Sequence, residues 1–391
     1  MSRNKTALSA VLPVLFGFFV MGFCDVVGIT SAHVKEDLLH AYSPEFRDTL
    51  SNLIAVALFS MFLIFSVPTG LLMNRIGRKK TVIFSNIITM VAMVIPLIDY
   101  TFVMSLIAFT LLGVANTMLQ VSLNPLLTNV VKDDRLLTSS LTAGQFVKAV
   151  SSFSAPFIAA FAAAQFGNWQ YIFPIYALVT LLSTLWLMFA PVHEDRPDGK
   201  AMNFGQVIGI LKDKTILLLF LGIVFVVGVD VGVNTAAPKI LMERAGLNSL
   251  EAGYGPSVYF ALRTLGAFLG AFLLARIAAP TFFRVNIAVA VIALGSLIFA
   301  QDKVLIFTLY GIIGFTISNV FPIIFGMAIR KRPDKANEIS GLMITGVFGG
   351  AVIPFFMGLL SDLLGSQTGA VLVILAGAVY LMYTAFAIRP Q

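Results

Sequence analysis

Four ionisable residues interrupt long apolar stretches of the chain: Asp25, Lys148, Asp230 and Arg263. A charge near the centre of a bilayer costs roughly 2.5–3.5 kcal/mol on insertion scales, so each group must be protonated, paired or in contact with water. Their formal charges sum to zero, which makes mutual pairing one explanation and a shared aqueous cavity the other. We interpret them as functional, because ionisable groups inside a membrane mark ion and substrate pathways.

The two aspartates occur in related surroundings. Asp25 lies in Gly22–Thr30 and Asp230 in Gly228–Thr235, and both stretches contain Asp-Val, a glycine, an aliphatic residue and a nearby threonine. An apolar setting destabilises an ionised carboxylate, so such a group can bind a proton on one side of a membrane and release it on the other. We predict that Asp25 and Asp230 couple transport to H⁺. Na⁺ is the alternative ion, but the sequence identifies no cage of oxygen ligands for it.

Polar side chains at helical spacing accompany these acids. Asn116, Gln120 and Asn124 recur every four residues and form one stripe, and Gln145 shares a face with Lys148. Amides carry both donors and acceptors, which suits sugar hydroxyls, whereas hydrogen bonding between helices is the competing explanation. The predicted substrate-binding residues are Asn116, Gln120, Asn124, Gln145, Lys148, Asn234, Arg263 and Asn319. Lys148 would bind an anionic group of the substrate or neutralise one of the aspartates.

These residues require membrane helices to position them. The chain of 391 residues is 58% hydrophobic and 12% charged, with a mean hydropathy of +0.94, which indicates an all-α membrane protein. The sequence contains no phosphate-binding Gly-Lys-Ser/Thr loop and no cluster of metal ligands, so we expect no enzyme, no metal and no cofactor. Twelve transmembrane helices are predicted, at residues 8–32, 50–74, 81–98, 102–131, 136–164, 169–191, 214–240, 251–277, 282–300, 303–329, 337–363 and 368–388.

An internal repeat divides these spans into two sets of six. Asp25 corresponds to Asp230, Arg75 to Arg276 and Pro125 to Pro322, each pair separated by about half of the 391 residues. Two parallel, pseudo-symmetric six-helix bundles would rock about a site between them. We predict an N-terminal half at 1–191, a cytoplasmic linker at 192–213 and a C-terminal half at 214–391.

We attribute the net charge of +7 to the orientation of the chain in the membrane rather than to nucleic-acid binding, because the basic residues cluster in alternate loops. The clusters are at 75–80 and 330–332, whereas the first loop on the other side is acidic. This asymmetry predicts that both termini are cytoplasmic. The short loops favour a bacterial inner membrane, and we expect a monomer in a lipid bilayer.

The stretch from Gly70 to Lys80 resembles the loop signature between spans two and three of the major facilitator superfamily. The resemblance implies that Gly70, Arg75, Gly77, Arg78 and Lys79 form a cytoplasmic gate. Asn74 departs from it, because an aspartate is usual there, and this weakens the expected charge contact of the closed gate.

A narrower resemblance is to the fucose–proton symporter family of sugar transporters. It rests on Asp25, Asn124-Pro125, Gln145-Phe146, Leu262–Gly266, Phe321–Phe325 and Gly349–Pro354. Gln120 stands where some members carry a glutamate, which puts a relay of two carboxylates in doubt. Lys148 stands where some members carry an asparagine, and this puts in doubt the expectation that the substrate is a strictly neutral sugar.

Together these features predict a secondary active transporter that imports a monosaccharide, a hexose or deoxyhexose such as fucose, glucose or galactose, by cation symport. The first alternative is an importer of a sugar acid or another organic anion that uses Lys148 and Arg263. Less favoured alternatives are a proton-driven exporter of lipophilic compounds, against which the amide stripe argues, and a membrane sensor that binds without transport.

Overall fold

The computed structural model describes residues 2–40, 44–131, 134–192, 194, 203–252 and 254–388. These residues form helices and loops, with no strand among them. Twelve candidate membrane spans occur, by length and composition, in agreement with the predicted number. The predicted linker, 192–213, lies partly outside the described residues, as do 389–391 at the end of the last predicted segment.

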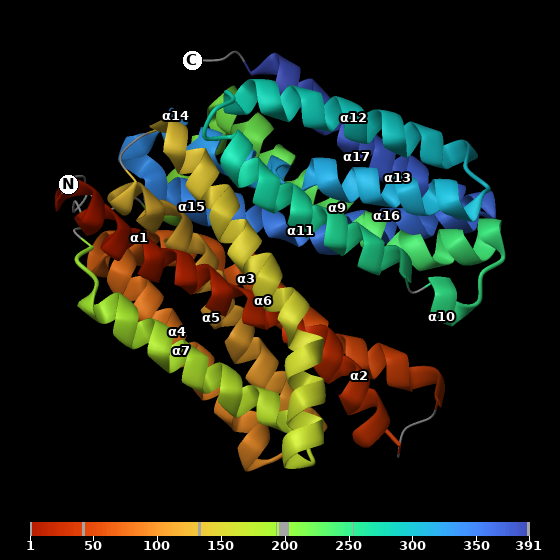
Figure 1. The fold of residues 1–391 in the computed structure, drawn as a ribbon, viewed down its shortest axis with the longest axis horizontal. Helices are drawn as coiled ribbons and strands as arrows, with labels where there is room; N and C mark the ends of the chain where they lie inside the picture. Colours follow the sequence, from red (N-terminus) through yellow and green to blue (C-terminus); the bar gives the residue numbers. More distant parts are fainter. Residues whose placement is uncertain are drawn as a thin grey trace. The chain divides into compact units, whose positions relative to one another are not determined.

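The first six spans begin with a discontinuous helix, α1 (Ser2–Met21), the 3-10 segment η1 (Gly22–Val26) and α2 (Val27–Asp37) (Figure 1). The following helices are α3 (Pro44–Ile76), α4 (Arg78–Ile98), α5 (Phe102–Val130), α6 (Asp134–Phe166), η2 (Trp169–Tyr171) and α7 (Ile172–Phe189). Gly77 separates α3 from α4 with a φ of 90°, a left-handed conformation that only glycine adopts without strain.

The remaining spans follow two short segments, α8 (Phe204–Gly209) and η3 (Ile210–Lys212). They comprise α9 (Lys214–Ala245), α10 (Ser249–Ala252), α11 (Tyr254–Leu273), α12 (Ala279–Phe299), α13 (Lys303–Ile317), α14 (Val320–Lys331), η4 (Pro333–Lys335), α15 (Ala336–Thr345), η5 (Gly346–Phe348), α16 (Gly349–Leu364) and α17 (Thr368–Ala387). The Asp213 carboxylate caps α9 by accepting hydrogen bonds from the Thr215 and Ile216 amides, at 2.8 and 3.3 Å.

The chain forms two compact units, each of which takes a short segment from the other half of the sequence repeat. Unit 1 comprises 1–132, 144–207 and 334–345, and unit 2 comprises 133–143, 208–333 and 346–391. The first turns of α6 therefore belong to unit 2, whereas α15 belongs to unit 1. The two bundles of the repeat, with the bounds predicted above, stay a prediction.

Within unit 1, α5 packs against α3 and α4, and α15 packs against α3 and α5. These contacts are close because glycines line them. A β-carbon on Gly113 of α5 would lie 2.4 Å from the Leu58 carbonyl oxygen, and one on Gly341 of α15 would lie 2.6 Å from that of Ser66. Close approach at small residues is how helices gain packing energy inside a bilayer.

Unit 2 follows the same rule. Helix α9 packs against α14, α16 and α17, while α11 packs against α13. A β-carbon on Gly349 of α16 would lie 2.1 Å from the Val224 carbonyl oxygen of α9, and one on Gly314 of α13 would lie 2.4 Å from that of Tyr259. The glycines thus hold the helices that carry the candidate site at short distance.

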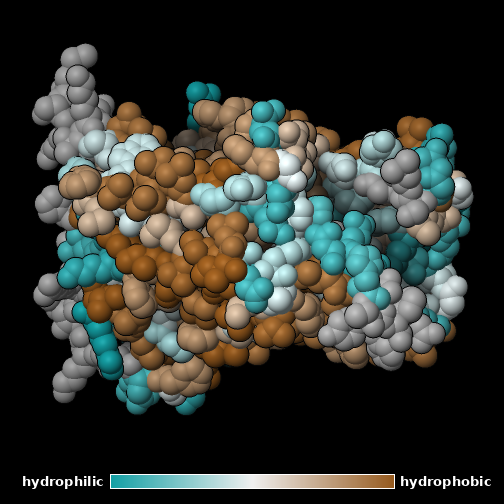
Figure 2. Space-filling model, turned by 90° about the horizontal axis from the view of Figure 1, so that it is seen from below, coloured by the Kyte–Doolittle hydropathy of each residue, from teal (hydrophilic) through white to brown (hydrophobic). Residues whose placement is uncertain are grey.

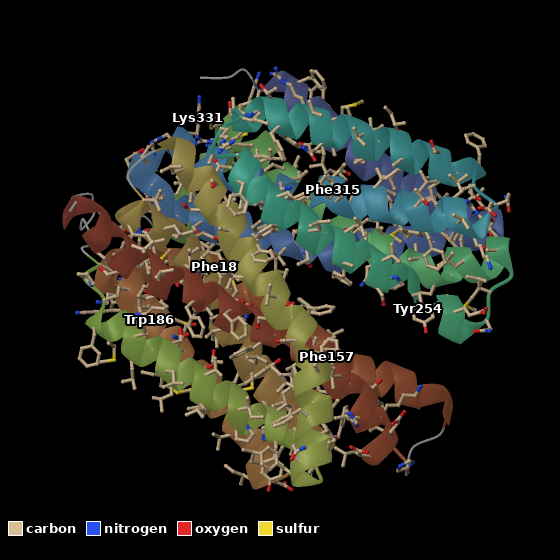
Figure 3. The ribbon with its side chains drawn as sticks, viewed as in Figure 1. Phe18, Phe157, Trp186, Tyr254, Phe315 and Lys331 are labelled. Carbon is tan, nitrogen blue, oxygen red and sulfur yellow. The ribbon has the colours of Figure 1, made fainter. Side chains whose placement is uncertain are left out.

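Large apolar side chains cover the outer surfaces of the helices. Hydrophobic residues occupy much of the face shown in Figure 2. Phe157 and Trp186 extend from the ribbons of α6 and α7 (Figure 3) and are 62% and 46% exposed. Exposed apolar surface on this scale requires a lipid environment. The protein is therefore an integral, multi-pass membrane protein, as the composition predicts.

Three of the spans are interrupted within the part of the chain that the structure describes. The first changes to a 3-10 segment at η1, the tenth breaks at Ser318-Asn319 between α13 and α14, and the eleventh changes at η5. Interruptions free backbone groups that must be satisfied within the protein, and they are tolerated where the backbone is buried or lines an aqueous cavity. They therefore mark the places where function is expected.

Candidate functional site

Asp25 lies in η1, at the interruption of the first span. Its neighbours Phe23, Cys24 and Val26 are buried, whereas Asp25 itself is exposed. Its carboxylate oxygen Oδ1 accepts a hydrogen bond from the Cys24 thiol at 3.4 Å, and Oδ2 accepts one from the Ser152 hydroxyl of α6. Among the described residues, no nitrogen of a lysine, arginine or histidine lies within 4.0 Å of this carboxylate. Asp25 therefore has hydroxyl and thiol partners but no paired charge.

Neighbouring helices stabilise the interruption at η1. The Asn116 side-chain amide of α5 donates to the Met21 carbonyl oxygen at 2.8 Å and so satisfies a backbone group at the end of α1. Gly22 allows η1 to approach α6, because a β-carbon there would lie 2.7 Å from the Lys148 carbonyl oxygen and 2.6 Å from Ser151 Cβ. The position of Asp25 is thus set by an amide on α5 and a glycine in η1.

The predicted amide stripe on α5 is buried and largely satisfied from within unit 1. Asn116, Gln120 and Asn124 are 2%, 7% and 1% exposed. Gln120 donates to Asn116 Oδ1 at 2.7 Å, and Asn124 donates to the Gln120 carbonyl oxygen at 2.8 Å. Asn124 Oδ1 accepts no hydrogen bond from the described residues. Asn116 thus joins α5 to α1, whereas Gln120 and Asn124 donate within α5, and the role of the stripe in substrate binding stays a prediction.

Gln145 and Lys148 lie on α6, partly exposed, two turns and one turn before Ser152, respectively. The Lys148 ammonium is close enough to interact electrostatically with the Cys24 thiol. It makes no ion pair within 4.0 Å among the described residues. Unit 1 thus brings Asp25, Lys148 and Ser152 together. The sequence analysis missed Ser152, although its spacing of four residues from Lys148 places it on the same helix face.

In unit 2, Asp230 has a cationic partner. Arg263 Nε of α11 lies 2.7 Å from Asp230 Oδ1 of α9, and the side chains are 29% and 22% exposed. The hydroxyl of Tyr259, which lies one turn before Arg263, donates to the same oxygen. Two predicted site residues therefore neutralise one another. Asn234, one turn beyond Asp230, has a side-chain oxygen without a hydrogen bond from the described residues.

Asn319 lies at the interruption of the tenth span and is 1% exposed. Its side-chain amide donates to the Gly266 carbonyl oxygen of α11 at 3.0 Å and to Ser318 Oγ at 2.8 Å. Gly270 leaves room for it, since a β-carbon there would lie 2.1 Å from Asn319 Oδ1. Asn319 thus ties the break to α11, as Asn116 ties the break of the first span to α5.

The predicted gate residues surround the junction of α3, α4 and α15, all within unit 1. Arg78 donates from Nε to Asn337 Oδ1 at 2.7 Å and from Nη1 to Asn129 Oδ1 at 2.7 Å. A β-carbon on Gly70 would lie 2.7 Å from the Asn337 carbonyl oxygen, while Arg75 is exposed. Lys79 Nζ donates to the Ala190 carbonyl oxygen at 2.9 Å, at the end of α7.

Asn74, which departs from the superfamily signature, makes polar contacts that join α3 to α15. Its side-chain amide donates to Glu338 Oε1 at 2.8 Å, and its oxygen accepts from Asn337 Nδ2 at 2.6 Å. Glu338 is 6% exposed. The carboxylate of this contact therefore lies on α15 rather than on α3. The loop signature includes no residue of α15, so it does not identify this partner.

A second cluster lies at the far end of the first span. The Asp37 carboxylate oxygen Oδ2 accepts from the Tyr100 hydroxyl at 3.1 Å and from Trp169 Nε1 at 3.4 Å. His33 stacks on Trp169 with ring centroids 4.2 Å apart. Burial and the neighbouring Asp37 carboxylate raise the pKa of Tyr100 above its usual range, which keeps the hydroxyl a donor. This cluster fastens α2 to the two adjacent loops.

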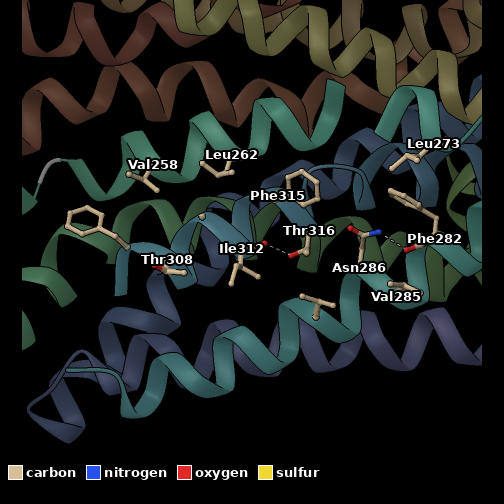
Figure 4. Close-up of a pocket in the computed structure, with 13 residues that line it drawn as sticks. Val258, Leu262, Leu273, Phe282, Val285, Asn286, Thr308, Ile312, Phe315 and Thr316 are labelled. Atoms are coloured by element: carbon tan, nitrogen blue, oxygen red, sulfur yellow. Dashed lines mark hydrogen bonds between the residues drawn. The ribbon is translucent and has the colours of Figure 1, made fainter. Parts of the chain in front are cut away.

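A cavity of about 700 Å³ lies among α11, α12 and α13 of unit 2 (Figure 4). Its polar groups are already used within their own helices, because Asn286 donates to the Phe282 carbonyl oxygen and Thr316 to that of Ile312. The remaining lining is apolar and unsuited to a sugar. No group of three or more potential metal-ligating residues occurs in the part of the chain that the structure describes.

Comparison with known proteins gives the family. The chain is 25% identical over 407 residues to a glucose/galactose transporter of Brucella abortus biovar 1 (strain 9-941), covering 98% of this chain and 95% of that protein. A variant of the E. coli fucose:proton symporter FucP superposes with a TM-score of 0.85 at 15% identity, over 99% of this chain and 100% of that one.

The proton:xylose symporter XylE superposes with a TM-score of 0.75 at 13% identity, over 99% of this chain and 96% of that one. These likenesses confirm the predicted twelve-helix fold. Residues 14–354 match the Major Facilitator Superfamily, which is most of the chain. The chain therefore belongs to the Major Facilitator Superfamily.

Proposed function

We propose that the protein imports a monosaccharide together with a proton by alternating access. The relatives support the substrate class, since they are named a glucose/galactose transporter, a fucose:proton symporter and a proton:xylose symporter. The observation that carries the coupling role is the setting of Asp25. This carboxylate lies at the interruption of a membrane span, without a cationic partner within 4.0 Å among the described residues.

A carboxylate without a fixed counter-charge is suited to proton binding, because its ionised form is stabilised only by neutral donors and water. Asp230 differs, since its charge is matched by Arg263 at 2.7 Å and its proton would have to compete with that cation. We therefore assign coupling to Asp25 and give Asp230, with Arg263 and Tyr259, the role of a polar surface within unit 2.

A sugar offers hydroxyls that donate and accept, so it requires side-chain amides and hydroxyls as partners. Gln145 on α6 is partly exposed, and Asn234 on α9 has an oxygen with no donor among the described residues. These two are our first candidates for direct contact. The side-chain N–H groups of Asn116 and Asn124 already donate to backbone carbonyl oxygens. We therefore give these two residues a supporting role, in which they stabilise the interrupted first span and α5.

The proposed setting is the inner membrane of a bacterium, with both termini in the cytoplasm and a monomer as the working unit. The basic loop at 75–80 then lies in the cytoplasm by the positive-inside rule. The lipid bilayer is the expected partner. No cofactor is required, because the proton gradient supplies the free energy.

The first experiment is uptake of labelled neutral sugars and sugar acids by proteoliposomes that contain the full chain, under an inward pH gradient and then an inward Na⁺ gradient. Glucose, galactose, fucose and xylose are the neutral probes. Accumulation of a neutral sugar driven by the pH gradient supports the proposal. Accumulation driven only by the Na⁺ gradient would show that Na⁺ rather than H⁺ is the coupling ion. No uptake under either gradient would overturn the proposal that the protein is an importer.

A second candidate is import of an anionic sugar acid, favoured by the ammonium of Lys148, which makes no ion pair among the described residues. A carboxylated sugar should then compete for uptake where its neutral parent does not. Lys148→Gln should abolish that preference. Equal competition by both sugars, before and after the substitution, would exclude a substrate role for this charge.

A further inference from the structure

The Ser152 hydroxyl has two hydrogen-bond acceptors within reach but only one hydrogen to donate. Its hydroxyl oxygen contacts Asp25 Oδ2 of η1, and it lies 3.1 Å from the Lys148 carbonyl oxygen of its own helix. A serine hydroxyl carries one hydrogen, so it can make a full two-centre hydrogen bond to only one of these acceptors at a time. Both contacts become full hydrogen bonds together only if Asp25 supplies the second hydrogen. The arrangement therefore has two states, distinguished by the proton of Asp25.

We propose that Ser152 is the positioning residue for the proton of Asp25, and that its hydroxyl changes partner with each protonation. This inference rests on the proposed function, in which Asp25 carries the coupled proton. When Asp25 is ionised, Ser152 donates to Oδ2. When a proton from water binds Oδ2, that O–H donates to Ser152 Oγ, and the serine hydrogen turns to the Lys148 carbonyl oxygen. Loss of the proton reverses both steps, and no other bond changes.

The two states hold η1 with different strength. The bond from Ser152 to an ionised carboxylate is charge-assisted and roughly twice as strong as the neutral bond that replaces it. Ionised Asp25 is therefore tied firmly to α6, and protonated Asp25 loosely. The contact lies beside a close approach of η1 to α6, since Gly22 has room for no β-carbon beside Ser151 and Lys148. Protonation thus relaxes the link between the interrupted span and the helix that carries Gln145 and Lys148.

Three other titratable groups face this carboxylate. Cys24 of η1 donates to Oδ1 at 3.4 Å, Lys148 of α6 interacts with that thiol, and Tyr176 of α7 interacts electrostatically with Asp25 and stacks on Phe23. Ser152 is the one hydroxyl among the described residues that bridges Asp25 to a neighbouring helix. Its removal should therefore change the titration of Asp25 without removing a charge.

Infrared difference spectroscopy of the full-length protein in liposomes tests this without any sugar. The C=O stretch of a protonated carboxyl group is followed as the pH is raised, and Asp25→Asn identifies the band. Ser152→Ala should move the midpoint of that band to higher pH by about one unit, because the ionised form loses a charge-assisted donor. Ser152→Thr, which keeps the hydroxyl, should restore the original midpoint.

Ser154→Ala is the matched control, since Ser154 lies two residues further along α6 and donates to the Ser151 carbonyl oxygen at 2.7 Å instead. It should leave the midpoint unchanged. If Ser152→Ala behaves like Ser154→Ala while the Asp25 band titrates, the role of Ser152 is overturned and the symport proposal stands. If Asp25→Asn removes no titrating band, the coupling role of Asp25 fails, and the inference with it.

Discussion

Arg263 Nε lies 2.7 Å from Asp230 Oδ1, whereas no lysine, arginine or histidine nitrogen of the described residues comes within 4.0 Å of the Asp25 carboxylate. The two aspartates occupy equivalent places in the sequence repeat, yet they have different electrostatic partners. A carboxylate paired with a cation is held ionised, while one that meets only hydroxyl and thiol groups can exchange its proton. We propose that this difference makes Asp25, rather than Asp230, the coupling residue.

Asp25→Asn should abolish uphill accumulation of sugar and leave counterflow exchange, because the amide mimics the protonated acid and cannot release its proton. Accumulation and counterflow are measured in the same proteoliposomes. Asp362→Asn, at an exposed position near the end of α16, is the control and should retain both activities. Loss of counterflow together with accumulation would show that Asp25 binds substrate or holds the fold instead.

Asp230→Asn and Arg263→Gln should each destabilise the protein by about 1–2 kcal/mol, because each leaves a partly buried charge without its partner. The double variant should recover most of that loss, since neither charge remains. Thermal unfolding of the purified proteins measures the free energies, and the coupling energy follows from the cycle. Additive losses in the double variant would mean that the 2.7 Å contact contributes little.

Asn74→Asp should weaken the junction of α3 and α15 by about 1–3 kcal/mol, since it replaces the donor to Glu338 with a second carboxylate. The double variant Asn74→Asp with Glu338→Gln exchanges the two groups and should restore stability, because one amide again meets one carboxylate. Thermal unfolding and the rate of uptake are measured for all three variants. Equal stability of the single and double variants would rule out this contact as the cause.

Gly349→Ala should destabilise unit 2 by about 1–3 kcal/mol through overpacking, because its β-carbon would lie 2.1 Å from the Val224 carbonyl oxygen. Gly358→Ala lies in the same helix, where an added β-carbon meets nothing within 4 Å, and it should be neutral or stabilising. Thermal unfolding compares the two. A tolerated Gly349→Ala would mean that α9 and α16 are further apart than the structure has them.

The sequence alone determined the membrane class, the twelve spans and the intramembrane acids, because hydropathy and charge are local properties that need no partner to be read. The resemblance at Gly70–Lys80 likewise predicted the superfamily. Short motifs and spacing also placed Asn116 beside Gln120 and Gln145 beside Lys148, since a helix fixes which residues share a face.

Only the tertiary structure decided which groups meet. The pairing of Asp230 with Arg263, the contact of Asn74 with Glu338 and the hydroxyl of Ser152 on Asp25 join residues 33, 264 and 127 positions apart in the chain. Such contacts depend on how helices pack, and the interruption at η1 depends on Asn116 capping the Met21 carbonyl oxygen. No periodicity within one helix contains that information, so the contact partners of each acid follow only from the tertiary structure.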